Sequence, residues 1–260
     1  GSKTKLPEAL AAATQTLISS DTHWLWILHD DSAPEPDCLA VLLETLETTA
    51  LVGAIAPKQV DPEQPRVIRQ LGLTLTPLGE PLSIVSGELD QSQHDTMSDV
   101  MAVSTAGLLV RTDIYEQLGG LSPKAPPLAA DYDLSLRIRL AGLRVMVAPA
   151  ARIRHAQLSL EGKRSRSWLG GSPKTAVRKA AVHLRLTFSP LWFALIYWML
   201  LPLVTVARTF WRLFQKRPDR IPAELLGGLW GFFTVGARLS ARAGNSRGDA
   251  GHGGADCAGG

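Results

Sequence analysis

Residues 23–48 read HWLWILHDDSAPEPDCLAVLLETLET, and this stretch decides the fold. The apolar run at 23–28 is short and predicts a buried strand. The strand stops at the polar residues 29–32, and residues 37–48 then have the spacing of an amphipathic helix. Asp37 lies near the start of that helix, where the helix dipole favours a carboxylate. A strand, a polar turn and a helix therefore follow one another here, as in an α/β unit.

The same alternation continues on both sides of this stretch. Strands are predicted at 51–56, 67–76, 82–86, 99–104, 107–111 and 143–148, and helices at 6–18, 113–118 and 131–141. Because strands and helices alternate along this part of the chain, the sequence predicts an α/β domain of Rossmann-like type with a mostly parallel sheet.

Charge is distributed unevenly along the chain. Residues 1–133 hold 7 Lys/Arg and 19 Asp/Glu, a net of −12, whereas residues 134–260 hold 20 Lys/Arg and 5 Asp/Glu, a net of +15. Residues 188–207 carry no charge and are long enough to span the hydrocarbon core of a bilayer, although a buried or interfacial helix has the same pattern. We expect an acidic catalytic part and a basic part near an anionic membrane surface. Nucleic acid is not an expected partner, because the basic run lacks interleaved aromatic residues.

These patterns divide the chain into four segments. They are a catalytic α/β domain over 1–157, a basic juxtamembrane segment over 158–187, membrane-embedded or interfacial helices over 188–239 and a disordered Gly-rich tail over 240–260. The two cysteines have neither a disulfide framework nor zinc-type spacing, which predicts a reducing compartment.

A pair of carboxylates, Asp30 and Asp31, follows the first predicted strand together with His29. Ligand sites in open α/β sheets lie at the carboxyl ends of strands. Two adjacent carboxylates are costly there unless a positive group lies beside them. Mg²⁺ and Mn²⁺ commonly bind one or two carboxylates together with a substrate phosphate. One interpretation is therefore a metal and diphosphate site, and the other is a solvated turn whose aspartates cap the next helix.

A second acidic cluster, Asp131 and Asp133, precedes Arg137. The two acids open the predicted helix at 131–141, where the helix dipole alone would favour them. The functional interpretation makes Asp131 a general base, which must lie within hydrogen-bond reach of an acceptor hydroxyl.

Two further polar features remain open to two interpretations each. His155 lies beyond the predicted strand at 143–148 and is either a metal ligand beside Asp31 or an ordinary histidine of a basic run. The stretch GELDQSQHD at 87–95 is dense in hydrogen-bonding groups and is either a surface loop or a loop that faces a substrate.

Taken in order, these segments resemble the bacterial, actinobacterial-type, membrane-associated family 2 glycosyltransferases. WLWILHDDSAP at 24–34 looks like that family's strand and acidic, DXD-like metal motif. TAGLLVRTDIYEQLGGLSP at 105–123 resembles the acceptor-side segment, and ADYDLSLRIRLAG at 130–142 resembles "ED-x-DL-x-x-R…G". VMVAPAARIRH at 145–155 resembles the closing "P…H", and the loop at 87–95 is similar to one of the same subgroup. The ordered set carries the resemblance, rather than any single motif.

The resemblance implies a GT-A fold that uses nucleotide-activated sugars with Mg²⁺ or Mn²⁺ and inverts by direct displacement. Asp30, Asp31 and His155 match the positions that would bind the metal and the donor diphosphate. Asp131 matches the presumed catalytic base. Supporting residues would be His29, Asp133 and Arg137, and acceptor-side residues would be Thr105 and Gly107.

The sequence departs from the family pattern at three places in these motifs. His29 stands where the first Asp of a DXD motif would be, Ala130 replaces the usual Glu, and Leu121-Ser122 replaces the common Phe-Asp. The family's strands that bind the nucleotide base would precede the helix at 6–18, so an N-terminally incomplete domain is expected. The expected partners are a nucleotide-sugar donor, a glycan or lipid-linked acceptor of the cell envelope and the inner membrane, with the catalytic domain on its cytoplasmic side.

Two other functions fit the same residues. A metal-dependent phosphohydrolase would use the two acidic clusters to release phosphate from simple esters without an acceptor. A non-catalytic, membrane-anchored degenerate transferase or scaffold would keep the fold and account for the departures at His29 and Ala130.

Overall fold

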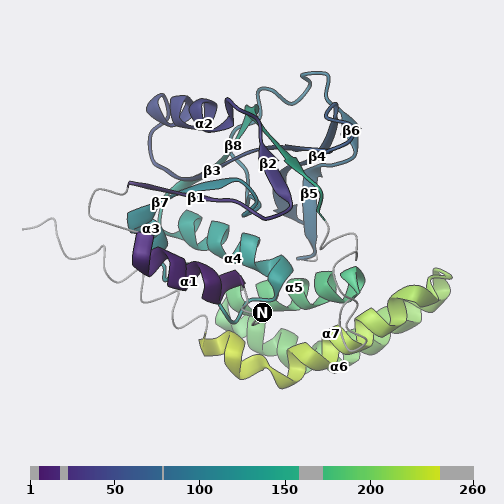
Figure 1. Cartoon of the computed structure of the whole chain (residues 1–260). Coiled ribbons are helices and arrows are strands. Elements are labelled where there is room, and N and C mark those ends of the chain that lie inside the picture. Colours follow the sequence, from purple (N-terminus) through teal and green to yellow (C-terminus); the bar gives the residue numbers. More distant parts are fainter. Residues whose placement is uncertain (1–5, 18–22, 78, 158–171, 241–260) are drawn as a thin grey trace, which may run out of the picture.

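A computed structural model describes residues 6–17, 23–77, 79–157 and 172–240 (Figure 1). The helices are α1 (Leu6–Leu17), α2 (Cys38–Glu47), α3 (Thr112–Gln117), α4 (Pro127–Leu140), α5 (Pro173–Phe188), α6 (Leu191–Phe214) and α7 (Ile221–Phe233), with a 3₁₀ turn η1 (Pro218–Arg220). The strands are β1 (Trp24–Ile27), β2 (Ser32–Pro34), β3 (Val52–Val60), β4 (Val67–Leu75), β5 (Pro81–Val85), β6 (Glu88–Leu89), β7 (Leu108–Arg111) and β8 (Arg144–His155). The predicted α/β class is confirmed.

The direction of the strands corrects the prediction of a mostly parallel sheet. The sheet runs β1-β7-β3-β4-β5, with β8 beside β3, β2 beside β8 and β6 beside β4. Among the described strands, the β3–β8 pair is parallel and the other pairs are antiparallel. The connections at 61–66 and 76–80 are too short for a crossover helix, so β3, β4 and β5 must join as antiparallel neighbours. The prediction of a parallel sheet rested on the alternation of strands and helices, which does not hold between residues 52 and 111.

β3 is the central strand, and every one of its residues is buried. Its side chains alternate between two cores: Ala54 and Ala56 pack in the core that contains α4, and Ile55 packs in the core that contains α2. A strand buried on both faces is apolar along nearly its whole length. Lys58 and Gln59 break this pattern although they are only 3% and 2% exposed. Buried polar groups need partners, so these two residues mark a polar site at the end of β3.

Two elements differ from their predicted bounds in ways that affect the site. α4 begins at Pro127 rather than at residue 131, because a proline in the first helical turn sacrifices no hydrogen bond. β8 continues past Pro149, where the sequence predicted its end, as far as His155. Residues 149–151 have no partner on β3, so the missing N–H of Pro149 removes no ladder hydrogen bond. The predicted strand at 99–104 forms only two isolated bridges.

The C-terminal helices form further layers beneath the sheet. Figure 1 shows α2 on one face of the sheet and α4, α5 and the α6–α7 pair in succession on the other. α5 contacts α4 through the cluster that includes Tyr132 and Leu184, and α6 contacts α5 through Tyr197 and Leu201. The predicted juxtamembrane segment at 158–187 therefore contains a packed helix from Pro173 onward. Residues 158–171 and nearly all of the predicted tail, 241–260, lie outside the described residues.

Candidate functional site

Polar side chains from five separate parts of the chain meet near the carboxyl end of β1. His29 and Asp31 follow β1, and His155 ends β8, which pairs with β2 next to them. Each of these three residues offers a ligand atom, and the three atoms lie within 4.8 Å of one another. Two imidazoles and one carboxylate at this spacing could together bind a divalent cation.

Gln59 fixes the orientation of the His155 ring. The Gln59 side-chain amide donates to the backbone carbonyl of Ala106 at 3.3 Å, and Gln157 donates to Gln59 Oε1 at 3.3 Å. His155 Nδ1 lies 2.8 Å from this same Oε1, which can only accept, so Nδ1 carries the proton. Nε2 then presents its lone pair to Asp31 Oδ1 at 3.2 Å. Two electron-rich atoms this close require a proton or a metal cation between them, and an outer hydrogen bond of this kind is typical of metal-binding histidines.

A hydrogen-bonded chain links His29 to Asp131 through Thr105. The Thr105 hydroxyl donates to Asp131 Oδ1 at 2.7 Å, and the Thr105 backbone N–H donates to the same oxygen at 3.2 Å. Because that hydroxyl has one proton, it must accept at 3.0 Å from His29 Nε2–H. His29 Nδ1 is then the ring nitrogen with a lone pair, which is the form that binds a metal. The candidate base is therefore connected to the candidate metal site through a single threonine.

Burial shifts the pKa of both residues at the ends of this hydrogen-bonded link, Asp131 and His29. Burial raises the pKa of Asp131 above its ordinary value, against the lowering effect of the Thr105 hydrogen bonds and of His29. Burial also lowers the pKa of His29, and it outweighs the nearby Asp131 carboxylate, which acts in the opposite direction. His29 is thus neutral at neutral pH, as a metal ligand must be, and Asp131 is a stronger base than an ordinary aspartate.

The turn that carries Thr105 depends on Gly107. Gly107 has φ +90°, a conformation that L side chains rarely adopt, and a Cβ there would lie 2.8 Å from Pro57 Cγ. Its backbone N–H donates to the carbonyl of Ile27 at 2.9 Å, and its carbonyl accepts from Trp26 Nε1 at 3.2 Å. Gly107 therefore fastens the turn to β1, beside the residues that follow that strand.

Asp133 and Arg137 lie on α4 but belong to a different, structural network. Asp133 is 1% exposed and accepts from Arg137 Nε at 2.9 Å, and His183 Nε2 on α5 lies 3.5 Å from its other oxygen. Burial opposes ionisation of Asp133, but the His183 hydrogen bond and the Arg137 charge outweigh it and lower the pKa of Asp133. Arg137 also donates to the carbonyls of Leu118 and Gly120. The two residues hold α4 against α5 and against the turn after α3.

The other predicted site residues are less closely joined to this group. Asp30 is exposed and does not belong to the three-residue cluster. The cluster contains His29 instead. Because α4 begins at Pro127, Asp131 lies in its second turn rather than at its first residue. The favourable position of an acid at a helix start therefore does not explain Asp131. Sequence reasoning missed Gln59, although a glutamine beside a lysine at the end of an apolar strand was a usable signal.

Comparisons with known proteins give a family match and a partial structural match. The sequence profile of the family described as "Glycosyltransferase like family 2" matches residues 1–178. No curated protein matches the chain. Among solved structures, a similar one is the crystal structure of GalNAc-T7 with UDP, GalNAc and Mn²⁺, with a TM-score of 0.48 and 13% sequence identity. The similarity covers 74% of this chain and 36% of that chain, so the sequence spans about a third of that protein.

Proposed function

Because the chain belongs to the glycosyltransferase family 2-like proteins, a family of glycosyl-transferring enzymes, we propose that it is a metal-dependent, inverting glycosyltransferase. It moves a sugar from a nucleotide-sugar donor to a hydroxyl of a glycan or lipid-linked acceptor. The observation that carries this proposal is the hydrogen-bonded link from Asp131 through Thr105 to His29, which belongs to the three-ligand cluster.

His29, Asp31 and His155 would hold the metal. A bound divalent cation offsets the charge of the departing nucleotide diphosphate. Nitrogen ligands suit transition metals better than Mg²⁺, which prefers oxygen, so this donor set favours Mn²⁺ over Mg²⁺.

Asp131 acts as the general base. Its Oδ1 is occupied by the two Thr105 hydrogen bonds, which fix the orientation of the carboxylate. The carboxylate takes the proton of the acceptor hydroxyl while the acceptor oxygen bonds to the anomeric carbon and the bond from that carbon to the diphosphate breaks. One such displacement inverts the anomeric configuration, and the raised pKa of Asp131 suits a base that works near neutral pH.

The proposal is tested by donor binding and turnover. The full chain, in detergent, is titrated with UDP-, GDP- and dTDP-sugars in Mn²⁺, in Mg²⁺ and after chelation. We expect one nucleotide class to bind, to require the metal and to bind more tightly with Mn²⁺ than with Mg²⁺. Metal-dependent release of phosphate from simple esters without any acceptor would instead indicate the phosphohydrolase. Absence of both donor binding and hydrolysis would indicate the non-catalytic scaffold.

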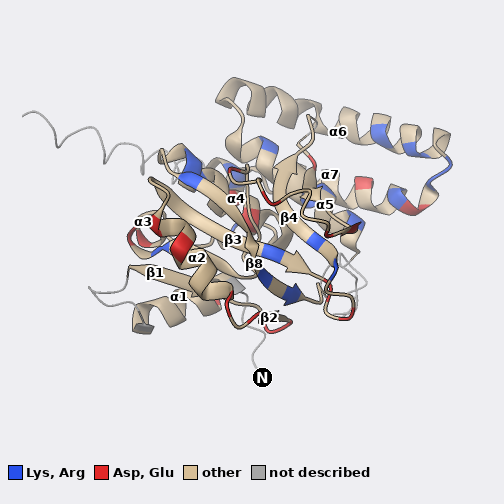
Figure 2. Cartoon of the chain, turned by 90° about the horizontal axis from the view of Figure 1, so that it is seen from above, with Lys and Arg blue, Asp and Glu red and all other residues tan. Residues whose placement is uncertain are grey.

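We further propose that α6 lies in a lipid bilayer, with the catalytic domain on the cytoplasmic side. Within the described part of the chain, α6 is the one helix long and apolar enough to cross a membrane, and 22% of its most apolar window is buried. A stripe of exposed apolar side chains runs along it and comprises Trp192, Ile196, Met199, Leu203, Phe210 and Phe214. In Figure 2 the charged residues of α6 lie near its C-terminal end, and the rest of the helix is free of charge.

The charged side chains of α6 turn toward α7 and β5, whereas the exposed apolar stripe lies on the other side of the helix. Arg208 Nε and Arg212 Nε lie 2.8 and 3.1 Å from the carboxylate of Glu224 on α7, and Arg208 also pairs with Glu80 near β5. α7 packs closely enough that a Cβ on Gly228 would lie 2.1 Å from the hydroxyl of Thr205. Polar groups inside and apolar groups outside are the arrangement expected in lipid rather than in water.

Flotation with liposomes tests the membrane contact. We expect the full chain to float with vesicles that contain anionic lipid, and Met199→Glu/Leu203→Glu to remain at the bottom of the gradient, because two charges would enter the apolar stripe. Leu82→Glu is the matched control, since Leu82 is 51% exposed on β5 outside the stripe. Equal flotation of the double variant and the control would refute the assignment of this face to lipid.

A further inference from the structure

Lys58 is a buried lysine that takes no part in the proposed reaction. Its Nζ lies 2.9 and 3.0 Å from the two carboxylate oxygens of Asp90 and 3.1 Å from Asp95 Oδ1. Asp90 is itself 10% exposed, whereas Asp95 is 49% exposed. A buried ammonium group is stable only with such partners, so the loop that carries both aspartates is fastened to β3 through Lys58.

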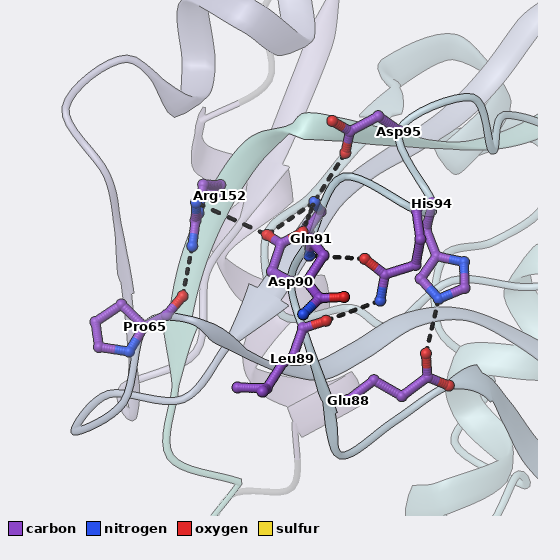
Figure 3. A network of polar contacts seen from close by, with 10 residues as sticks. Pro65, Glu88, Leu89, Asp90, Gln91, His94, Asp95 and Arg152 are labelled. Carbon is purple, nitrogen blue, oxygen red and sulfur yellow. Dashed lines mark hydrogen bonds and ion pairs between the residues drawn. The ribbon is translucent and has the colours of Figure 1, made fainter.

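Asp90 also contacts the neighbouring strand. Arg152 on β8 has Nη1 3.8 Å from Asp90 Oδ2, and it also donates to the carbonyl of Pro65, as Figure 3 shows. Lys58 and Arg152 are direct Cα partners in the parallel β3–β8 pair. A single carboxylate therefore bridges two paired strands, and we call Lys58, Asp90 and Arg152 the Asp90 clamp.

The position of Asp90 is set by its own loop and by Arg66, the residue before β4, none of which belongs to the His29–Asp31–His155 cluster. The backbone N–H of Asp90 donates to the carbonyl of Arg66 at 2.7 Å. Beside it, Gln93 accepts from the Gln91 backbone N–H at 2.7 Å and donates to the Leu89 carbonyl at 2.8 Å (Figure 3). The clamp thus links β3 and β8 to a loop whose conformation is fixed by its own hydrogen bonds.

The clamp lies where the register of β8 is reset. Pro57 pairs with Ala148, but the next residue, Lys58, pairs with Arg152, so three residues of β8 bulge out between these two pairs. After the bulge Gln59 pairs with Ile153, and β8 ends at His155. A bulge disrupts the ladder locally and re-aims the side chains that follow it, and here the ladder resumes at the Lys58–Arg152 pair. That first pair is the one that Asp90 bridges.

We propose that the Asp90 clamp is a positioning device for the metal site: by holding the Lys58–Arg152 pair in register, it places Gln59 so that its Oε1 meets His155 Nδ1. Asp90, Lys58 and Arg152 do not touch the substrate or the metal; they act through Gln59 and His155. This inference rests on the metal role of His155 in the proposed function. It predicts that the loop at 87–95 affects metal affinity although none of its residues is a ligand.

The test compares two aspartates that each pair with an arginine of β8. Asp90→Asn removes the charge that bridges the strands, and Asp99→Asn removes the partner of Arg144 at the other end of β8. Mn²⁺ binding to the full chain is followed by electron paramagnetic resonance, and the His155 ring by NMR of ¹⁵N-labelled histidine. We expect Asp90→Asn to mix the His155 tautomers and to weaken Mn²⁺ binding, by at most the about 10- to 100-fold that follows loss of the ligand's own hydrogen-bond partner, here Gln59. Asp99→Asn should do neither.

Folding of Asp90→Asn is checked by thermal melting. If that variant does not fold, Arg152→Gln replaces it, since Arg152 is 38% exposed, and it should change affinity and tautomer in the same direction. Folded variants that keep wild-type Mn²⁺ affinity and a single His155 tautomer would overturn the clamp. The NMR readout needs no metal: a wild-type chain that binds no Mn²⁺ refutes the metal role, whereas an unchanged tautomer in the variants refutes the clamp alone.

Discussion

Asp131→Asn is expected to lower the rate of sugar transfer by about 10²- to 10⁴-fold, the usual contribution of a general base. The amide keeps the shape of the side chain and can still accept the two hydrogen bonds of Thr105, but it cannot take a proton. Donor binding should be nearly unchanged, because Asp131 is not one of the clustered ligands. Turnover and donor affinity are measured on the same preparation, so that a loss of kcat is separated from a loss of binding.

The pH profile adds a second signature of Asp131. The base must be ionised to act, and burial raises its pKa, so the wild-type rate should fall on the acid side at a pH above about 4, the ordinary pKa of aspartate. Asp113→Asn is the matched control, because Asp113 is 61% exposed and pairs only locally with Arg111. Wild-type turnover by Asp131→Asn would exclude this residue as the base.

Asp31→Ala is expected to abolish metal-dependent donor binding. Asp31 supplies the carboxylate of the three-ligand cluster, and its loss would leave two neutral imidazoles to hold a dication. Loss of a residue that is hydrogen-bonded to a metal ligand typically lowers metal affinity about 10- to 100-fold. Loss of the ligand Asp31 itself should lower it by more. Titration calorimetry with Mn²⁺, followed by the donor nucleotide that binds the wild type, measures the metal and donor steps separately.

Asp30→Ala provides the sharpest comparison for Asp31→Ala. The two residues are adjacent and share the same charge, but Asp30 is exposed and is not in the cluster. A small effect of Asp30→Ala beside a complete loss in Asp31→Ala would assign the metal to Asp31 with His29 and His155. Equal losses would return Asp30 to the metal site that the sequence alone predicted. A wild-type response of Asp31→Ala would refute the cluster as a metal site.

Much of the secondary structure could be predicted from local pattern. The helices α1 and α2 and the strands β1, β4, β5 and β7 lie within a few residues of their predicted bounds, because each carries its own periodicity and its own stop signals. Asp31, Asp131 and His155 could be selected because charged or titratable groups beside apolar strands demand an explanation. Composition likewise marked residues 188–207 as unusual, and these lie largely within α6.

The arrangement of these parts depended on contacts between distant residues, which no local pattern encodes. Strand direction outside the β3–β4–β5 hairpins follows from long-range pairing: β7 pairs antiparallel with both β1 and β3, and β2 pairs antiparallel with β8. The tautomer of His29 follows from Thr105, which lies 76 residues away in sequence. The tautomer of His155 follows from Gln59, 96 residues away.

The sequence by itself determined the α/β class, the apolar helix and most of the candidate chemical groups, because periodicity, charge and burial cost act within a few residues. Only the tertiary structure decided which acid is linked to the candidate metal site, since Asp131 and Asp133 are two residues apart on α4 and face different neighbours. Asp131 meets Thr105, whereas Asp133 meets Arg137 and His183. The physical reason is the geometry of the helix, which turns residues two apart to different sides, so that packing rather than spacing assigns each carboxylate its partners.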